Sequence, residues 1–232
     1  MITFINKLSR KIIARGGIPG KVAGRLQRVF WLRTYGVWMS DLATPDVPQL
    51  SCREQHAGSV HWELATIEDC LLWSQSGADG FAPWQCVMMS KCIEENRLVL
   101  VGYENAENDP AKRVLQVPDC YAILACDRKC VGTRCFFYAE SGESVIHNLY
   151  VREQSRGRGL ATRIYAEVHR RAQEYGLTKM YADIDLSNIA SYKTAEKAGA
   201  VRIQDAIIYR VSFFKRSYIF ARGSLKDRFR QA

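Results

Sequence analysis

The sequence lacks several features that would assign a protein class directly. It contains no run of roughly eighteen uncharged apolar residues, so a membrane-spanning helix is not expected. Its N-terminus has no apolar stretch followed by a small-residue cleavage site, which argues against a secretory signal. Internal repeats and low-complexity segments are also absent. With 47% hydrophobic and 25% charged residues, the 232-residue chain has the composition of a folded globular protein.

Cysteine pairs with metal-binding spacing are absent too. The eight cysteines include no CxxC pair, so a structural zinc site is not indicated and no metal is expected. Most of them lie in apolar segments, where a free thiol behaves as a small hydrophobic side chain. We interpret them as reduced thiols of a cytoplasmic protein. A weak metal site or a disulfide among Cys126, Cys130 and Cys135 stays open.

Acidic residues are missing from the first forty positions, which carry eight basic residues. Residues 212–232 add six basic residues against one acidic, so the net charge of +9 arises at the two ends of the chain. The basic residues of the N-terminal segment are interspersed with apolar residues from Ile2 to Leu32, the last of which are Val29, Phe30, Trp31 and Leu32. This pattern predicts two short amphipathic helices, separated at Gly16–Gly20. They could pack on the domain, contact an anionic membrane or an acidic partner, or form a transit peptide. Nucleic acid is not favoured, because no nucleic-acid-binding motif accompanies the charge.

The middle of the chain predicts alternating strands and helices, as in a mixed α/β domain. A strand over 59–65 precedes a helix that Thr66 and Asp69 cap, and a second helix runs from Pro83 towards Glu95. We expect a linker at residues 41–58 and a surface loop at residues 104–118. A hairpin is expected from strands over 120–126 and 131–138. The remaining expected elements are strands over 98–103, 145–151 and 178–184, helices over 157–175 and 189–198, and two closing strands within 201–221.

One turn has a composition that suits anion binding. Arg156–Ala161 (RGRGLA) lies between the predicted strand 145–151 and a helix with apolar residues at fourfold spacing. The glycines let the backbone approach an anion, and the N–H groups of the first helical turn point towards it. The sequence therefore predicts a phosphate-binding turn, the alternative being a basic turn that only starts a helix. Positive charge comes from Arg156, Arg158 and Arg163.

Three segments together resemble the GNAT acyltransferases. They are Ala65–Asp69, Leu149–Val151 before the turn Arg156–Ala161, and Asn188–Ser191 ahead of Glu196–Ala200. Arg156, Gly159 and Ala161 fit the family's Arg/Gln-x-x-Gly-x-Gly/Ala signature. The resemblance spans about residues 59–211 and implies the GNAT fold, a mixed α/β sheet splayed at the acyl-CoA site with helices on both faces. We expect a basic extension and linker at 1–58, the acyltransferase domain at 59–221 and a basic tail at 222–232.

The resemblance implies acetyl-CoA, or another acyl-CoA, as the donor. The pyrophosphate would bind the amides of residues 156–161, and the pantetheine arm would pair with the backbone of Leu149–Val151. A backbone N–H at Leu149 or Tyr150 would stabilise the developing oxyanion. The implied cofactor-binding residues are Leu149, Tyr150, Val151, Arg156, Gly157, Arg158, Gly159, Leu160, Ala161, Asn188 and Ser191.

The acceptor implied by the resemblance is a primary amine that attacks directly, so no cysteine is expected as a nucleophile. His147 is the candidate general base, because histidine exchanges protons near neutral pH; Asp183 and Asp185 are alternatives. Many family members carry a tyrosine seven residues after the motif asparagine, where this chain has Ala195. Tyr192, one turn earlier, is the candidate proton donor.

The sequence accordingly predicts an N-acetyltransferase for an amino sugar or another small amine. An acyltransferase acting on a peptide or protein amine stays open. A CoA-binding regulatory protein without activity also stays open, and Ala195 motivates it. The expected partners are the small amine and, through the basic ends, a membrane surface contacted peripherally. The expected location is the cytoplasm.

Overall fold

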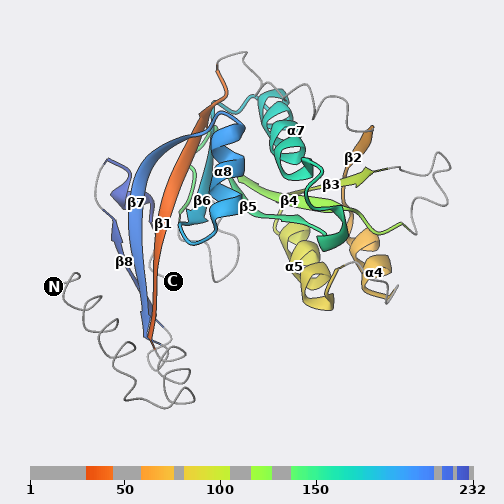
Figure 1. Ribbon diagram of the computed structural model, residues 1–232, viewed down its shortest axis with the longest axis horizontal. Coiled ribbons are helices and arrows are strands. Elements are labelled where there is room, and N and C mark those ends of the chain that lie inside the picture. Colours follow the sequence, from red (N-terminus) through yellow and green to blue (C-terminus); the bar gives the residue numbers. More distant parts are fainter. Residues whose placement is uncertain are drawn as a thin grey trace.

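The computed structural model describes residues 30–43, 59–75, 81–104, 116–126, 137–211, 216–221 and 224–229. Within them lies an eight-stranded sheet in the order β2-β3-β4-β5-β6-β1-β7-β8 (Figure 1). Only the pair β5–β6 is parallel among these neighbours. The strands are β1 (Phe30–Asp41), β2 (Val60–Leu64), β3 (Leu98–Glu104), β4 (Cys120–Cys126), β5 (Glu143–Val151), β6 (Lys179–Asp185), β7 (Val201–Val211) and β8 (Arg216–Ala221).

Helices cover both faces of the sheet, as expected. Side chains alternate along a strand, so Leu100 and Leu124 belong to the core beneath α7 (Leu160–Glu174) and α8 (Ile189–Lys197). Their neighbours Val99 and Ile123 belong to the core beneath α4 (Ile67–Gln75) and α5 (Pro83–Glu94). None of the helices described is long and apolar enough to cross a membrane.

The predicted start of α4 is confirmed in atomic detail. The Thr66 N–H donates to Asp69 Oδ2 at 2.8 Å, and the Asp69 N–H donates to Thr66 Oγ1 at 3.2 Å. These reciprocal bonds satisfy amide groups that have no partner within the helix. Pro83 likewise opens α5, where its missing N–H costs nothing.

Strand β1 corrects the prediction for the N-terminal part. Phe30–Leu32 were expected at the end of an amphipathic helix within the extension 1–58, but they open a strand that pairs with both β6 and β7. Val37 and Trp38 of this strand are fully buried. A short apolar run fits either a buried strand or a helix, because its periodicity does not separate the two. The sheet therefore starts at Phe30 rather than at residue 59. The amphipathic helices predicted within 1–29 lie outside the described residues.

The predicted hairpin of 120–126 with 131–138 is wrong. β4 pairs with β3 along one edge and with β5 along the other, so neither edge accepts a further strand. Residues 131–136 lie outside the described residues, and Phe137 forms a single bridge with Phe229. The composition of 131–138 suits a strand, but it does not show which edges of β4 are already occupied.

Burial of core thiols and phenols predicts a loss of stability at alkaline pH. Desolvation raises the pKa of Cys70 from 9.0 to about 11, and those of Tyr121 and Tyr165 from 10.0 to about 12. As the pH rises above about 9, the unfolded chain loses these protons before the folded protein does, so the free energy of unfolding falls. We expect the Tm, measured under reducing conditions at fixed ionic strength, to drop steeply between about pH 9 and 12. An unchanged Tm across that interval would contradict this expectation.

Candidate functional site

The parallel strands β5 and β6 separate partway along their length. Their pairing begins at Glu143 and Lys179 and ends at Ile146 and Ala182. Beyond that point β5 continues to Val151 beside β4, while β6 continues to Asp185 beside β1. The edge of β5 after Ile146 therefore faces an opening instead of a neighbouring strand. This confirms the splayed sheet that the resemblance implied.

A β-bulge bends β5 where the two strands separate. The pairing between β4 and β5 shifts between Tyr121 and Ile123, which places two residues of β5 opposite Ala122. One of these, Asn148, has a φ of 47°, in the left-handed region that asparagine tolerates better than most residues. Its side-chain Nδ2 donates to the Met88 sulfur of α5 at 3.0 Å. Bulges commonly redirect the backbone beside functional sites.

The turn after β5 presents a series of backbone N–H groups. Gly157 and Gly159 both have a φ of 78°, which glycine adopts without strain. The first hydrogen bonds of α7 run from the Thr162 and Arg163 amides to the Gly159 carbonyl. Among the described residues, the amides of 157–161 donate to no backbone carbonyl. Such a group of N–H donors at the start of a helix is suited to an anionic phosphate.

Asp119 holds the entrance of this turn in place. Its Oδ1 accepts a hydrogen bond from Ser155 Oγ at 2.6 Å, and its Oδ2 accepts one from the Glu104 amide at 2.8 Å. The Asp119 carbonyl accepts from the Arg152 amide at 2.9 Å. The side chain and backbone of Asp119 thus join the ends of β3 and β5, and the residues before the turn, to the start of β4. No motif marked this role, because the contacts join segments that are distant in sequence.

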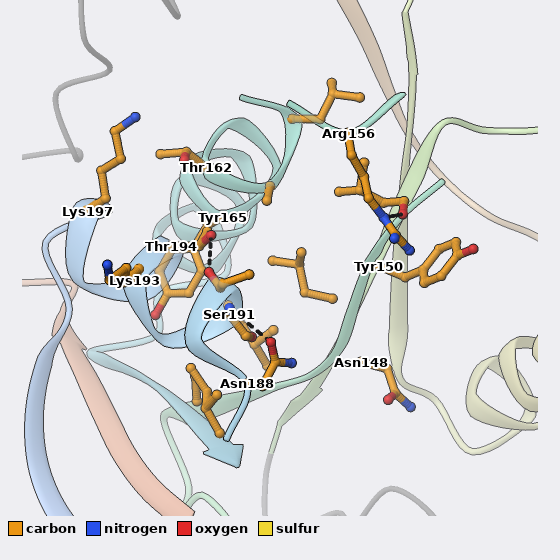
Figure 2. Close-up of a pocket in the computed structure, with 18 of the residues that line it drawn as sticks. Asn148, Tyr150, Arg156, Thr162, Tyr165, Asn188, Ser191, Lys193, Thr194 and Lys197 are labelled. Carbon is orange, nitrogen blue, oxygen red and sulfur yellow. Dashed lines mark hydrogen bonds between the residues drawn. The ribbon is translucent and has the colours of Figure 1, made fainter. Parts of the chain in front are cut away.

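The two arginines of the turn have different surroundings. Arg156 lines the pocket, and its Nε donates to the Val151 carbonyl at 3.2 Å (Figure 2). The Arg158 guanidinium instead contacts Glu104 Oε2 at 2.9 Å and the Gln154 carbonyl at 3.1 Å. Arg158 is not among the residues that line the pocket. Only its backbone N–H therefore belongs to the turn's group of donors.

The splayed strands, the turn and α8 surround a pocket of about 810 Å³ (Figure 2). This volume lies in the range of small-molecule and cofactor sites. Ala190, Lys193, Thr194 and Lys197 also line it from one side of α8, and their spacing of three or four residues was the signal that sequence reasoning overlooked. The predicted site residues that the pocket brings together are Leu149, Tyr150, Val151, Arg156, Gly157, Gly159, Leu160, Ala161, Asp183, Asn188 and Ser191.

Asn188 starts α8 at the wall of the pocket. Its Oδ1 accepts a hydrogen bond from the Ser191 amide at 3.2 Å, as an N-cap side chain does, and the Asn188 carbonyl accepts from the same amide at 3.1 Å. Because the oxygen is used in this bond, the Nδ2 group of Asn188 stays available to the pocket. Figure 2 shows both residues on the side of α8 that faces β5.

His147 and Asp183 form a buried pair where the strands separate. His147 Nδ1 lies 3.3 Å from Asp183 Oδ1, and each side chain is 7% exposed. His147 alternates along β5 with Ile146, which lines the pocket, and His147 itself does not line it. Asp183 does. The predicted base therefore lies behind a carboxylate that faces the pocket.

The placement of Tyr192 does not support its predicted role as a proton donor. Its ring stacks on Trp38, with centroids 5.8 Å apart and an interplanar angle of 8°, and it is not among the pocket-lining residues. Ala195 is 1% exposed and packs in the same core as Trp38. Trp38 of β1, a strand that the sequence did not predict, thus occupies the space beneath α8.

Burial makes four of the described cysteines poor nucleophiles. Desolvation raises the pKa values of the Cys70, Cys86, Cys92 and Cys120 thiols, so they remain protonated near neutral pH. No group of three or more potential metal ligands occurs in the described part of the chain. Cys130 and Cys135 lie outside that part.

Comparison with protein families identifies the region that contains this pocket. The family model described as "Acetyltransferase (GNAT) family" matches residues 90–200. No curated protein matches the chain significantly.

Solved structures resemble the chain in fold at low sequence identity. The GCN5-related glucosamine N-acetyltransferase region of a fungal multi-domain GH3 β-N-acetylglucosaminidase has 14% identity and a TM-score of 0.55, over 80% of this chain and 22% of that one. A Drosophila protein has 11% identity and a TM-score of 0.51, over 90% and 57%. A GNAT-family acetyltransferase from Colwellia psychrerythraea has 14% identity and a TM-score of 0.50, over 78% of this chain and 56% of that one. The chain thus spans less than two thirds of each of these three proteins.

The matched region coincides with the site. Residues 90–200 contain the splayed strands, the glycine turn and every residue that lines the pocket. The fold and the family expected from the sequence are both confirmed. The chain carries an acetyltransferase domain of the GNAT family.

Proposed function

We propose that the protein is an N-acetyltransferase that transfers an acetyl group from acetyl-CoA to a primary amine. One observation carries this proposal. A single pocket joins the open edge of β5 to the amide donors of residues 157–161 and to the Arg156 side chain. An acyl-CoA needs both features, because it combines a pyrophosphate with an extended chain of amides.

The chain offers fitting partners for each part of that donor. The amides of residues 157–161 would bind the pyrophosphate, with Arg156 adding charge. The backbone of Leu149–Val151 would pair with the pantetheine amides, as a sheet edge pairs with an extended peptide. Asn188 and Ser191 would contact the far end of the pantetheine from α8.

The pocket also holds groups suited to aminolysis. When bound, acetyl-CoA supplies a thioester that an amine can attack. A backbone N–H at Leu149 or Tyr150, beside the bulge, would stabilise the oxygen as it gains charge. Asp183 would attract the ammonium form of the acceptor and accept its proton, with His147 positioning the carboxylate. Protonation of the departing sulfur is assigned to water, since Tyr192 packs on Trp38.

Turnover with a panel of amines tests this function. The full chain is incubated with acetyl-CoA and amino sugars, other small amines or peptides, and thiol release and acetylated product are measured. We expect product from at least one small amine. Product from peptides alone would favour the alternative of a peptide acyltransferase. CoA binding without product from any amine would favour the inactive regulatory protein. A cytoplasmic location belongs to this proposal as well.

Arg156 and Arg158 make a matched pair for testing the donor site. Arg156→Gln removes a charge from the pocket, so we expect the Kd for CoA to rise about tenfold, as for a lost charge-assisted hydrogen bond. Arg158→Gln removes a charge that already contacts Glu104, so we expect a change within about twofold. Isothermal titration calorimetry compares the two, and equal losses of affinity would contradict the assignment.

A further inference from the structure

We propose that Lys193 and Lys197 bind the 3′-phosphate of CoA, so that the protein distinguishes CoA from 3′-dephospho-CoA. The proposal rests on the proposed function, because it requires CoA in the pocket.

Both lysines lie on the wall of the pocket. They are four residues apart on α8, which places their side chains on the same side of the helix, with Cβ atoms about 6 Å apart. Both line the pocket and are exposed. Figure 2 shows Lys197 at the end of α8.

CoA carries one more phosphate group than the glycine turn is suited to bind. The amides of residues 157–161 and Arg156 suit the two linked phosphates of the pyrophosphate. CoA also carries a separate phosphate monoester on its ribose, with a charge near −2. A monoester presents oxygens in several directions, and two flexible ammonium groups can approach it as point charges. Lys193 and Lys197 supply such a pair on another wall of the same pocket.

The charges around the pocket also favour an anion at this position. Two like charges four residues apart repel each other on a helix. Of the carboxylates that line the pocket, Asp183 lies beside His147, and Asp185 accepts hydrogen bonds from the Ser187 amide and hydroxyl at 2.9 and 2.7 Å. The adjacent Glu196 accepts a hydrogen bond from Trp38 Nε1 at 3.4 Å. A bound phosphate would reduce the repulsion between the lysines.

Titration with two ligands and three proteins tests the proposal. CoA and 3′-dephospho-CoA are titrated by calorimetry into the wild type, the double variant Lys193→Gln/Lys197→Gln, and the control Lys91→Gln. Lys91 is an exposed lysine of α5, outside the pocket. We expect wild type and control to bind CoA about tenfold more tightly than 3′-dephospho-CoA. The double variant is expected to lose this preference while its affinity for 3′-dephospho-CoA stays the same.

Two results would overturn the proposal. In the first, the double variant keeps the preference for CoA. In the second, the double variant loses affinity equally for both ligands. The lysines would then contact the pyrophosphate, or attract both ligands through their general positive charge. Either result leaves CoA binding by the wild type, and hence the proposed function, intact. Failure of the wild type to bind either ligand would instead remove the proposed function and this inference together.

Discussion

Replacing Gly159 by aspartate is expected to weaken CoA binding by at least about a hundredfold. Gly159 adopts φ 78° and ψ 4° at the start of α7, among the amides assigned to the pyrophosphate. An aspartate would place a negative charge within a few ångströms of two phosphate charges, and each such contact costs on the order of 1–4 kcal/mol near a protein surface. It would also require a side chain in a left-handed conformation. Calorimetric titration with CoA measures the loss.

Two further variants separate the causes of this effect. Gly159→Asn has nearly the same shape without the charge, and asparagine tolerates the left-handed region, so its loss should be much smaller. Gly176→Asp makes the same substitution at the other end of α7, where φ is 70° and an added Cβ meets nothing within 4 Å. It should bind CoA like the wild type. A folded Gly159→Asp protein with wild-type affinity would contradict the assignment of the turn.

Replacing Asp183 by asparagine is expected to lower kcat by a factor of about a hundred to a thousand, within the range for loss of a general base. The amide side chain would keep the size of the carboxylate at the pocket, but it would neither accept the amine proton nor attract the ammonium. The Kd for CoA should stay the same, because the pyrophosphate site lies on the turn and on α7. Higher pH should partly restore activity, because more of the acceptor is then already deprotonated.

Asp185→Asn is the matched control for this variant. Asp185 also lines the pocket, two residues further along, but its Oδ1 accepts hydrogen bonds from Ser187. We expect its kcat to stay within a few-fold of the wild type. Equal losses in both variants would indicate a general electrostatic effect of the strand end, and an unchanged kcat in Asp183→Asn would exclude this carboxylate as the base.

Local chemistry made much of this molecule predictable. The capping pair Thr66 and Asp69, the proline at the start of α5 and the glycines of the turn each act within a few residues of their own position. Such signals depend on neighbouring residues alone, so they can be recognised without knowing how the rest of the chain folds. The phosphate-binding geometry of Arg156–Ala161 follows from the same local rules. These local rules predict that the turn binds an anion, and the resemblance to the GNAT family then indicated that the anion is the pyrophosphate of an acyl-CoA.

Contacts between distant segments set the limits of that prediction. β1 pairs with both β6 and β7, whereas the short apolar run Phe30–Leu32 by itself does not distinguish a strand from a helix. The ring of Trp38 in that strand stacks on the ring of Tyr192, so Tyr192 packs between α8 and the sheet instead of entering the pocket. The pairing of His147 with Asp183 likewise depends on how β5 and β6 align. The arrangement of catalytic candidates therefore depended on strand order and register.

Amide hydrogen exchange of the full chain, with and without saturating CoA, tests most directly whether the donor binds in this pocket. The N–H groups of residues 157–161 donate to no backbone carbonyl in the described structure, so a bound pyrophosphate should slow their exchange strongly. Residues 148–151 on the open edge of β5 should be protected with them. Protection confined to these two segments is the predicted result. Calorimetrically saturated protein with no change in exchange at 157–161 would contradict the account.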